Sequence, residues 1–129
     1  MSKKKTNPKK KAVKKADDWM SKYIRARDRR CITCRSTANL TNSHLITRAK
    51  HSVRWHEPNC YCQCHGCNLR HEYQPEIYTD WWILKHGEAA YHELVLKSNT
   101  PSRFKAYDIE EIAEEYKNKY LTIIDKYDD

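Results

Sequence analysis

The chain has 129 residues, of which 39% are hydrophobic, and its four tryptophans and nine tyrosines suffice for one modest core. It carries 25 basic and 17 acidic residues, a formal net charge of +8. This length excludes a large multidomain protein, and no stretch approaches the roughly eighteen apolar residues of a membrane span. We therefore expect a single domain without membrane contact, located in the cytoplasm.

The charge is unevenly placed along the chain. Residues 1–16 hold eight lysines and no acidic residue, which leaves 17 basic and 17 acidic residues in the remainder. Like charges at this density oppose burial, so we expect residues 1–16 to form a disordered basic arm. Such an arm favours a polyanionic partner, most simply DNA, although a tail that serves only solubility is the alternative.

A folded core is expected over residues 17–75. Asp17 or Asp18 can cap a helix whose apolar residues recur at helical spacing as far as Ile24. This helix would deliver Cys31 to a metal site. The arginines on its other side suit either an ordinary solvated surface or contact with phosphates.

Two short extended segments are expected next, over residues 38–46 and 60–63. Residues 48–58 show no sustained period and are interpreted as a loop. Gly66 would permit a tight turn, and Asn68 would open a short helix. Strand, loop, strand and helix would thus follow one another closely.

Residues 76–129 are expected to be a helical scaffold of the same domain. A helix after Pro75 would end at Gly87, and another would cover residues 88–97. An acidic capping box beginning at Asp108 would open a long C-terminal helix. The acidic outer face of that helix argues against DNA contact there, and it is the expected interface if the protein is a homodimer.

Four of the six cysteines form two Cys-x-x-Cys pairs about thirty residues apart, a spacing typical of a zinc site with four thiolates. The predicted ligands of this closed, structural zinc are Cys31, Cys34, Cys64 and Cys67. Disulfides are the alternative, but the lysine run is not followed by the apolar region of an export signal, which favours zinc. Cys60 and Cys62 would be buried apolar residues on one face of the second strand.

With zinc saturated by cysteine, His44, Asn59 and Asn68 are available for catalysis. A histidine ending one strand, an asparagine before the next and an asparagine at the following helix is the order of an HNH nuclease motif, here HNN. Hydrolysis of a phosphodiester needs a base for water and a divalent ion for the developing charge. A neutral histidine suits the base, and the amide oxygen of Asn68 suits Mg²⁺. Asn59 would fix the loop and orient His44. The predicted fold is therefore α+β, a zinc-stabilised ββα-metal (HNH) core flanked by helices.

The sequence resembles the NinG or Rap recombination nucleases of lambda-like bacteriophages. The motifs that carry the resemblance are Cys31-x-x-Cys34, Ser43-His44, Arg54-Trp55-His56-Glu57-Pro58-Asn59, Cys64-x-x-Cys67-Asn68 and residues 77–90. The likeness covers most of residues 20–124 and leaves the lysine arm outside. It implies a metal-dependent, structure-specific HNH endodeoxyribonuclease that cuts branched recombination intermediates, such as Holliday junctions and D-loops, in the cytoplasm of a bacterial host.

By this resemblance, His44 is the general base and Asn68 is a ligand of a catalytic Mg²⁺ or Mn²⁺. Arg54 would clamp a phosphate, with a structural ion pair to Glu57 as the alternative. The expected DNA contacts in this basic part of the chain are Arg48, Lys50, Arg54 and Arg70.

Ser43 departs from the wider HNH pattern, in which a metal-binding aspartate often precedes the catalytic histidine. The affinity for the catalytic ion would then be low, or another ligand would come from a residue such as His65, His71 or Glu72, and the sequence does not decide between these alternatives. Two other functions remain open: a zinc-stabilised DNA-binding protein without catalysis, and an HNH restriction or homing nuclease acting on linear duplex. The first predicts salt-dependent binding without metal-dependent cleavage, and the second predicts recognition of sequence in duplex DNA.

Overall fold

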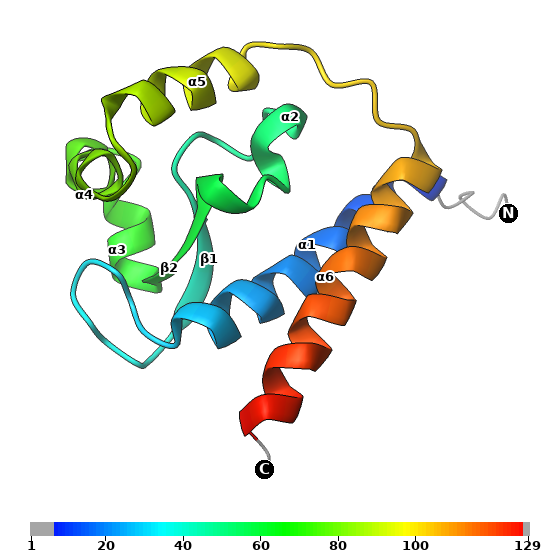
Figure 1. The fold of residues 1–129 in the computed structure, drawn as a ribbon, viewed down its shortest axis with the longest axis horizontal. Coiled ribbons are helices and arrows are strands. Elements are labelled where there is room, and N and C mark those ends of the chain that lie inside the picture. Colours follow the sequence, from blue (N-terminus) through cyan, green and yellow to red (C-terminus); the bar gives the residue numbers. More distant parts are fainter. Residues whose placement is uncertain (1–6, 128–129) are drawn as a thin grey trace, which may run out of the picture.

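A computed structural model describes residues 7–127 of the chain (Figure 1). In chain order its elements are α1 (Pro8–Asp28), β1 (Leu40–His44), α2 (His51–Arg54), a 3₁₀ turn η1 (Glu57–Asn59), β2 (Cys60–Cys64), α3 (His65–Arg70), α4 (Glu76–His86), α5 (Glu88–Ser98) and α6 (Ala106–Tyr127). The fold is α+β, as predicted, with a two-stranded sheet near its centre. α1 and α6 lie on one side of that sheet, and α3, α4 and α5 lie on the other (Figure 1).

The sheet is an antiparallel pair whose register places His44 opposite Cys60 and Asn42 opposite Cys62. β1 lies within the segment predicted to be extended, and β2 runs one residue beyond its predicted end. Because side chains alternate in direction along a strand, Asn42 and His44 share one face of β1 while Ser43 occupies the other. The register therefore places the predicted base, His44, at the point where the connection to β2 begins.

α1 begins at Pro8, well before the predicted helix start at Asp17. The side chain of Asn7 caps the helix by accepting a hydrogen bond of 2.9 Å from the Lys9 N–H. The expectation of a disordered arm is therefore wrong for residues 8–16, while the part of it that falls on the first six residues lies outside the described residues.

This lysine-rich segment is helical because one of its faces is apolar. Ala12 and Ala16 are fully buried one turn apart, and Met20 and Ile24 continue the same face. The two alanines let α6 approach closely, whereas the lysines between them extend into solvent. α6 contributes to the same first core cluster through Ile109, Ala113 and Tyr116.

α1 and α6 start at the same end of the molecule and run in the same general direction (Figure 1). Near their starts Lys15 pairs with Glu110 at 2.9 Å, and further along the rings of Tyr23 and Tyr116 pack with centroids 5.7 Å apart. Segments from the two ends of the chain are thus joined in one unit, which we call the α1–α6 pair.

A second core cluster lies between the sheet region and α4–α5. Its buried members are Leu45, Val53, Tyr78, Trp82 and Leu94. Tyr78 donates its hydroxyl proton to Ser43 O over 2.9 Å, and Trp82 Nε1 donates to Pro58 O over 2.7 Å. α4 therefore fixes the backbone at both ends of the connection between β1 and β2.

Three local predictions for the central segment are wrong. Residues 48–58, expected to be a loop, contain α2 and the start of η1. α3 begins at His65, so Gly66 lies inside a helix with no left-handed backbone, and Asn68 lies within the helix instead of opening it. Helix formation satisfies the backbone of this segment, so the tight turn expected at Gly66 is not needed.

The C-terminal helices follow the predictions more closely. Gly87 ends α4 as expected and has a φ of 94°, a conformation that favours glycine. Asp108 lies inside α6 rather than at its cap, and it accepts a hydrogen bond of 2.8 Å from the Lys105 N–H. Among residues 7–127, no helix combines the length and the apolar character that crossing a membrane requires.

Candidate functional site

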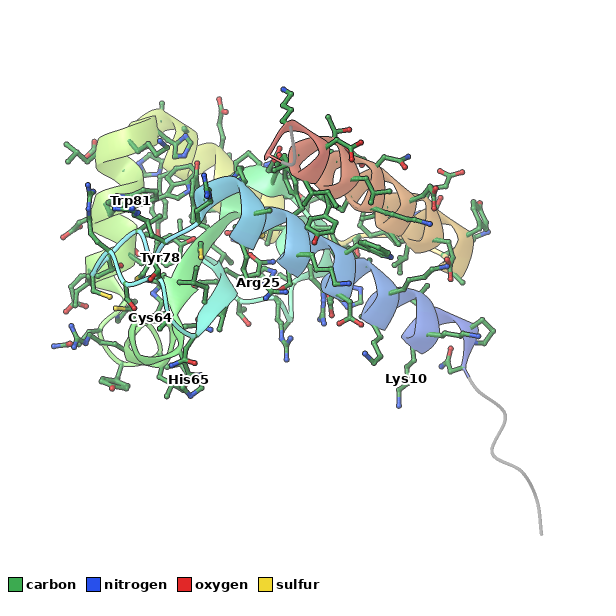
Figure 2. All side chains as sticks on the ribbon, turned by 90° about the horizontal axis from the view of Figure 1, so that it is seen from below. Lys10, Arg25, Cys64, His65, Tyr78 and Trp81 are labelled. Carbon is green, nitrogen blue, oxygen red and sulfur yellow. The ribbon has the colours of Figure 1, made fainter. Side chains whose placement is uncertain are left out.

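The four cysteines of the predicted zinc site lie together. One pair follows α1 and the other lies at the junction of β2 and α3, where Figure 2 shows sulfur atoms beside Cys64. The four Sγ atoms lie within 4.8 Å of one another, and Cys34 Sγ is 3.6 Å from Cys64 Sγ. Tetrahedral zinc with bonds of about 2.3 Å places sulfurs about 3.8 Å apart, so the cluster could bind zinc. Within residues 7–127, it is the one such grouping of three or more histidine, cysteine or acidic side chains.

The backbone prepares Cys31 for metal binding. The N–H groups of Thr33 and Cys34 each donate to Cys31 Sγ over 3.4 Å. Burial raises the pKa of this thiol, but the backbone donors outweigh burial and lower the pKa of Cys31 to about 7. Because zinc binds the thiolate, these donors favour the ligating form.

Cys60 and Cys62 do not belong to the metal cluster. Both are fully buried in the first core cluster, which confirms the prediction that they are apolar core residues. Burial raises the pKa of both thiols, that of Cys62 to about 12, so both remain protonated at neutral pH.

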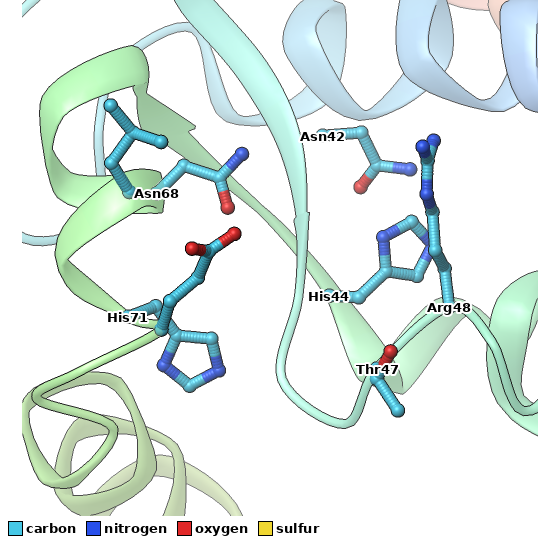
Figure 3. Close-up of a pocket in the computed structure, with 8 residues that line it drawn as sticks. Asn42, His44, Thr47, Arg48, Asn68 and His71 are labelled. Carbon is cyan, nitrogen blue, oxygen red and sulfur yellow. The ribbon is translucent and has the colours of Figure 1, made fainter.

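A cavity of about 520 Å³ opens between the end of β1 and α3. It brings together two of the predicted catalytic residues, His44 and Asn68. One wall comes from β1 and the segment after it and consists of Asn42, His44, Thr47 and Arg48. The opposite wall comes from α3 and the turn after it and consists of Asn68, Leu69, His71 and Glu72 (Figure 3).

One nitrogen of the His44 ring is fixed and the other is available. His44 Nε2 lies 2.8 Å from Arg54 O, which can only accept, so Nε2 carries the proton and Nδ1 carries the lone pair. Burial lowers the pKa of His44 below 6.5, and the hydrogen bond to Arg54 O opposes part of this effect. The ring is therefore neutral at neutral pH and able to accept a proton at Nδ1.

Asn59 is fully buried and holds the segment that carries Arg54. Its Nδ2 donates to Ile46 O at 3.0 Å and to Val53 O at 3.1 Å, and its Oδ1 accepts from Ile46 N at 2.9 Å. Because Val53 directly precedes Arg54, these bonds fix the carbonyl that orients His44. Asn59 therefore acts on His44 through the backbone and does not line the cavity.

Asn68 lies against Ser43, the residue that stands in the place of the expected aspartate. The Ser43 hydroxyl is 2.9 Å from Asn68 Oδ1 and 2.7 Å from Gln63 Oε1. A hydroxyl has one proton for these two oxygens, so Asn68 Oδ1 keeps lone pairs for a cation in the cavity. Ser43 itself is fully buried and does not line the cavity, and its hydroxyl holds the Asn68 amide by hydrogen bonding.

Three residues were considered as a further ligand of a catalytic cation, and their positions relative to the cavity distinguish them. His71 and Glu72 line it, whereas His65 does not. The ring of His71 is fixed by Nε2, which lies 2.8 Å from Leu45 O. Glu72 is exposed and offers a carboxylate, the kind of hard ligand that Mg²⁺ prefers, so the geometry favours Glu72.

Arg54 has a structural partner in place of a phosphate. Its guanidinium forms a two-pronged ion pair with Asp17, with Nη2–Oδ2 and Nε–Oδ1 distances of 2.6 and 3.0 Å. Trp55 Nε1 donates to the same carboxylate at 2.9 Å. The alternative partner, Glu57, pairs with Arg27 at 3.5 Å. Arg54 therefore joins α2 to α1, and the alternative of an ion pair with Glu57 is wrong, whereas its contact with a DNA phosphate stays a prediction.

The remaining basic residues predicted to contact DNA lie at different places. Arg48 lines the cavity beside His44 and is exposed. Lys50 Nζ donates to Asn99 Oδ1 over 2.6 Å and lies outside the cavity, as does Arg70. Of these residues, Arg48 is the one placed to meet a phosphate near the predicted base.

Asn42 and Thr47 line the cavity although no motif in the sequence singled them out. The signal for Asn42 was present, because it lies two residues before His44 in a predicted strand and therefore on the same face. That its Oδ1 is buried and unpaired could not be seen from the sequence.

Fold and site together define a small α+β protein in which a four-cysteine cluster that could bind zinc lies near a cavity lined by histidine and asparagine. The chain matches the family described as Bacteriophage Lambda NinG protein over residues 1–126, and it belongs to that family. The match begins at residue 1, so it includes the lysine-rich segment that the resemblance in the sequence was expected to leave out. The chain matches no curated protein and no solved structure.

Proposed function

We propose that the chain is a metal-dependent endonuclease of the HNH type that cuts branched DNA. The observation that carries the proposal is the placement of His44 and Asn68 on opposite walls of one cavity (Figure 3). A neutral imidazole with an available Nδ1 and an amide oxygen facing the same space are parts that phosphodiester hydrolysis requires. The elements that carry them follow in the order β1, β2, α3, which is the order of the HNH motif.

His44 is the general base of this reaction. Because Nε2 is bonded to Arg54 O, the proton taken from water arrives at Nδ1. The water oxygen bonds to phosphorus as the bond from phosphorus to the leaving oxygen breaks. The carbonyl of Arg54 favours the charged ring that results, so the same contact that fixes the ring also supports the transfer.

Asn68 and Glu72 are the residues that would hold the divalent cation. Both offer oxygen, and a cavity of about 520 Å³ leaves room for the waters that Mg²⁺ retains. Bound there, Mg²⁺ or Mn²⁺ would stabilise negative charge on the phosphate and on the leaving oxygen. The carboxylate of Glu72 would repel a phosphate in the cavity without a cation, which is a second reason to place one there.

Basic side chains around the cavity suit a DNA partner. Arg48 lies on the cavity wall, and Figure 2 shows Lys10 of α1 extending on the same side of the molecule as His65 at the start of α3. Neutralising phosphates with such residues supplies affinity that does not depend on sequence. The preference for branched DNA follows from the resemblance to recombination nucleases, since no residue of the chain encodes a branch.

A cleavage assay tests the proposal. Purified zinc-loaded protein is incubated with a four-way junction or with a linear duplex of matched sequence, in the presence of Mg²⁺, Mn²⁺ or no added divalent ion. We expect nicks in the junction that depend on the added ion, and slower cleavage of the duplex.

The other results point to the two alternatives. Tight, salt-dependent binding without cleavage of either substrate would contradict the proposal and favour a zinc-stabilised DNA-binding protein. Equal cleavage of junction and duplex would keep the nuclease but remove the preference for branches.

A further inference from the structure

The cavity contains a buried polar atom without a partner. Among the described residues, two buried side-chain nitrogen or oxygen atoms lack a hydrogen bond, Asn42 Oδ1 and His71 Nδ1, and both belong to residues that line the cavity. Most buried polar side-chain atoms in folded proteins are satisfied by protein or by water, so an orphan that borders a cavity indicates a missing ligand. Asn42 borders the cavity that contains His44.

The orientation of the Asn42 amide is fixed from the other side. Its side chain lies beside Cys60 and opposes the burial that raises the pKa of that thiol, which is the effect of an N–H donor. The thiol itself is directed at Arg54 O over 3.7 Å. A thiol that points its proton at a carbonyl offers its sulfur as an acceptor, so the amide nitrogen of Asn42 faces Cys60. Oδ1 is therefore left to face away from Cys60, and a flip of the amide would put two acceptors together.

Asn42 and His44 lie two residues apart on β1, and Figure 3 shows both side chains on the same wall of the cavity. Residues two apart in a strand are separated by about 6.8 Å along it and point to the same face. A water bonded to two acceptors at about 2.8 Å spans at most about 5.6 Å, so a bridge requires the polar ends of the two side chains to converge. Figure 3 shows the amide oxygen of Asn42 on the side of the His44 ring. Asn42 Oδ1 and His44 Nδ1 are both acceptors.

We propose that Asn42 is a catalytic residue that holds the attacking water for His44, an inference that rests on the proposed nuclease function. One O–H of the water donates to Asn42 Oδ1 and the other to His44 Nδ1, which takes that proton. The oxygen bonds to phosphorus, the bond from phosphorus to the leaving oxygen breaks, and the leaving oxygen takes a proton from solvent. Throughout the step the remaining O–H stays on Asn42, which keeps the lone pair of the attacking oxygen aimed at phosphorus.

This assignment explains why a neutral amide occupies the position. A carboxylate there would stabilise the imidazolium and raise the pKa of His44, so the ring would be protonated at a pH where it must be neutral. An aliphatic side chain would leave the water with one partner and a wider range of orientations, which costs rate without changing the base.

The test compares three single substitutions of the full-length, zinc-loaded protein. Asn42→Ala is expected to lower the single-turnover cleavage rate of a four-way junction by about 10- to 100-fold while junction affinity, zinc content and melting temperature stay near wild type. Thr47→Ala, on the same cavity wall, is the control and is expected to cut within about twofold of wild type. Asn42→Asp is expected to raise the pH at which the rate is half-maximal on the acid side.

Two results would overturn the inference. The first is an Asn42→Ala variant that retains the wild-type rate. The second is an Asn42→Ala variant that loses zinc and thermal stability together with the rate, which would make Asn42 a structural residue. A titration of the His44 ring by NMR in wild type and Asn42→Asp separates this inference from the nuclease proposal. An unshifted His44 pKa shows that residue 42 does not face the ring, even if no DNA is cut; a raised pKa with no cleavage of any DNA by wild type removes the nuclease function and leaves the geometry standing.

Discussion

The α1–α6 pair and the segment from Cys31 to Glu72 are built by different means. The pair is held by apolar packing along two long helices, with Ala12 and Ala16 of α1 facing Ile109 and Ala113 of α6. The other segment has two short strands, two short helices and a 3₁₀ turn, and it depends on four thiols and on buried hydrogen bonds. We call it the cysteine core.

The difference separates stability from chemistry. Every residue that lines the cavity beside His44 belongs to the cysteine core, and none belongs to α1 or α6. The pair packs on this core through Trp55, Cys60 and Cys62, which belong to its apolar cluster. Polar contacts add to this packing: Asp28 accepts from Cys62 N at 2.8 Å, and Tyr116 donates to Trp55 O at 2.6 Å. The comparison teaches that the pair positions the site, whereas the core carries the residues proposed to perform the reaction.

Removal of a zinc ligand should have the largest effect. Cys67→Ser is expected to abolish zinc binding and to unfold the cysteine core, because structural zinc contributes about 10–16 kcal/mol in small domains, as much as the whole stability of a typical protein. Hydrogen exchange should show lost protection in β1 and β2 with more protection kept in α1 and α6.

Cys62→Ser is the matched control, since Cys62 is a buried cysteine outside the metal cluster. It should keep zinc and lose only part of the stability. If Cys67→Ser instead melted helices and strands together, the two regions would form one cooperative unit and the comparison would fail.

The contribution of the Asp17–Arg54 ion pair, which joins the two regions, is tested by substituting Asp17. Asp17→Ala leaves the guanidinium of Arg54 and the indole N–H of Trp55 without their acceptor, at sites where both side chains are mostly buried. We expect a loss of about 2–3 kcal/mol in the free energy of unfolding, measured by urea denaturation.

The neighbouring Asp18 provides the control for this substitution. It pairs with Lys14 on the surface, where its side chain is 60% exposed, so Asp18→Ala should cost less than about 0.5 kcal/mol. Equal effects of the two substitutions would show that the contact between α1 and α2 adds no stability.

The pH dependence of cleavage gives the smallest effect. Burial lowers the pKa of His44 below 6.5, so its neutral, active form should dominate from about pH 6.5 upward. As the pH falls through that lowered pKa, the rate should drop tenfold per pH unit, equivalent to about 1.4 kcal/mol. An acid limb with a midpoint above pH 7 would mean that His44 is not the titrating base.

The chemistry of the site was easier to predict from the sequence than its packing. Zinc needs four soft ligands in two closely spaced pairs, so the spacing of Cys31, Cys34, Cys64 and Cys67 already restricts the fold. Once these pairs meet, β1 and α3 must lie close together, which is why His44 and Asn68 share a cavity as expected.

Features that depend on distant partners could not be predicted. The lysines at the N-terminus indicated disorder, but Ala12 and Ala16 pack on α6, nearly the whole chain away. Arg54 was predicted to contact a phosphate or nearby Glu57, whereas its ion-pair partner in the structure is Asp17. Asp17 was expected at the start of the first helix, but it lies well inside α1. Local pattern carries no signal for such contacts, and tertiary packing overrides propensity.

The central claim is that His44 removes a proton from water in the cavity. The most direct test is the single-turnover rate of junction cleavage by His44→Ala against wild type, at saturating protein with Mg²⁺ and with zinc content and junction affinity measured in parallel. The account predicts a rate lower by about 10²- to 10⁴-fold at unchanged affinity and zinc content. A variant that cuts the junction at the wild-type rate would contradict it.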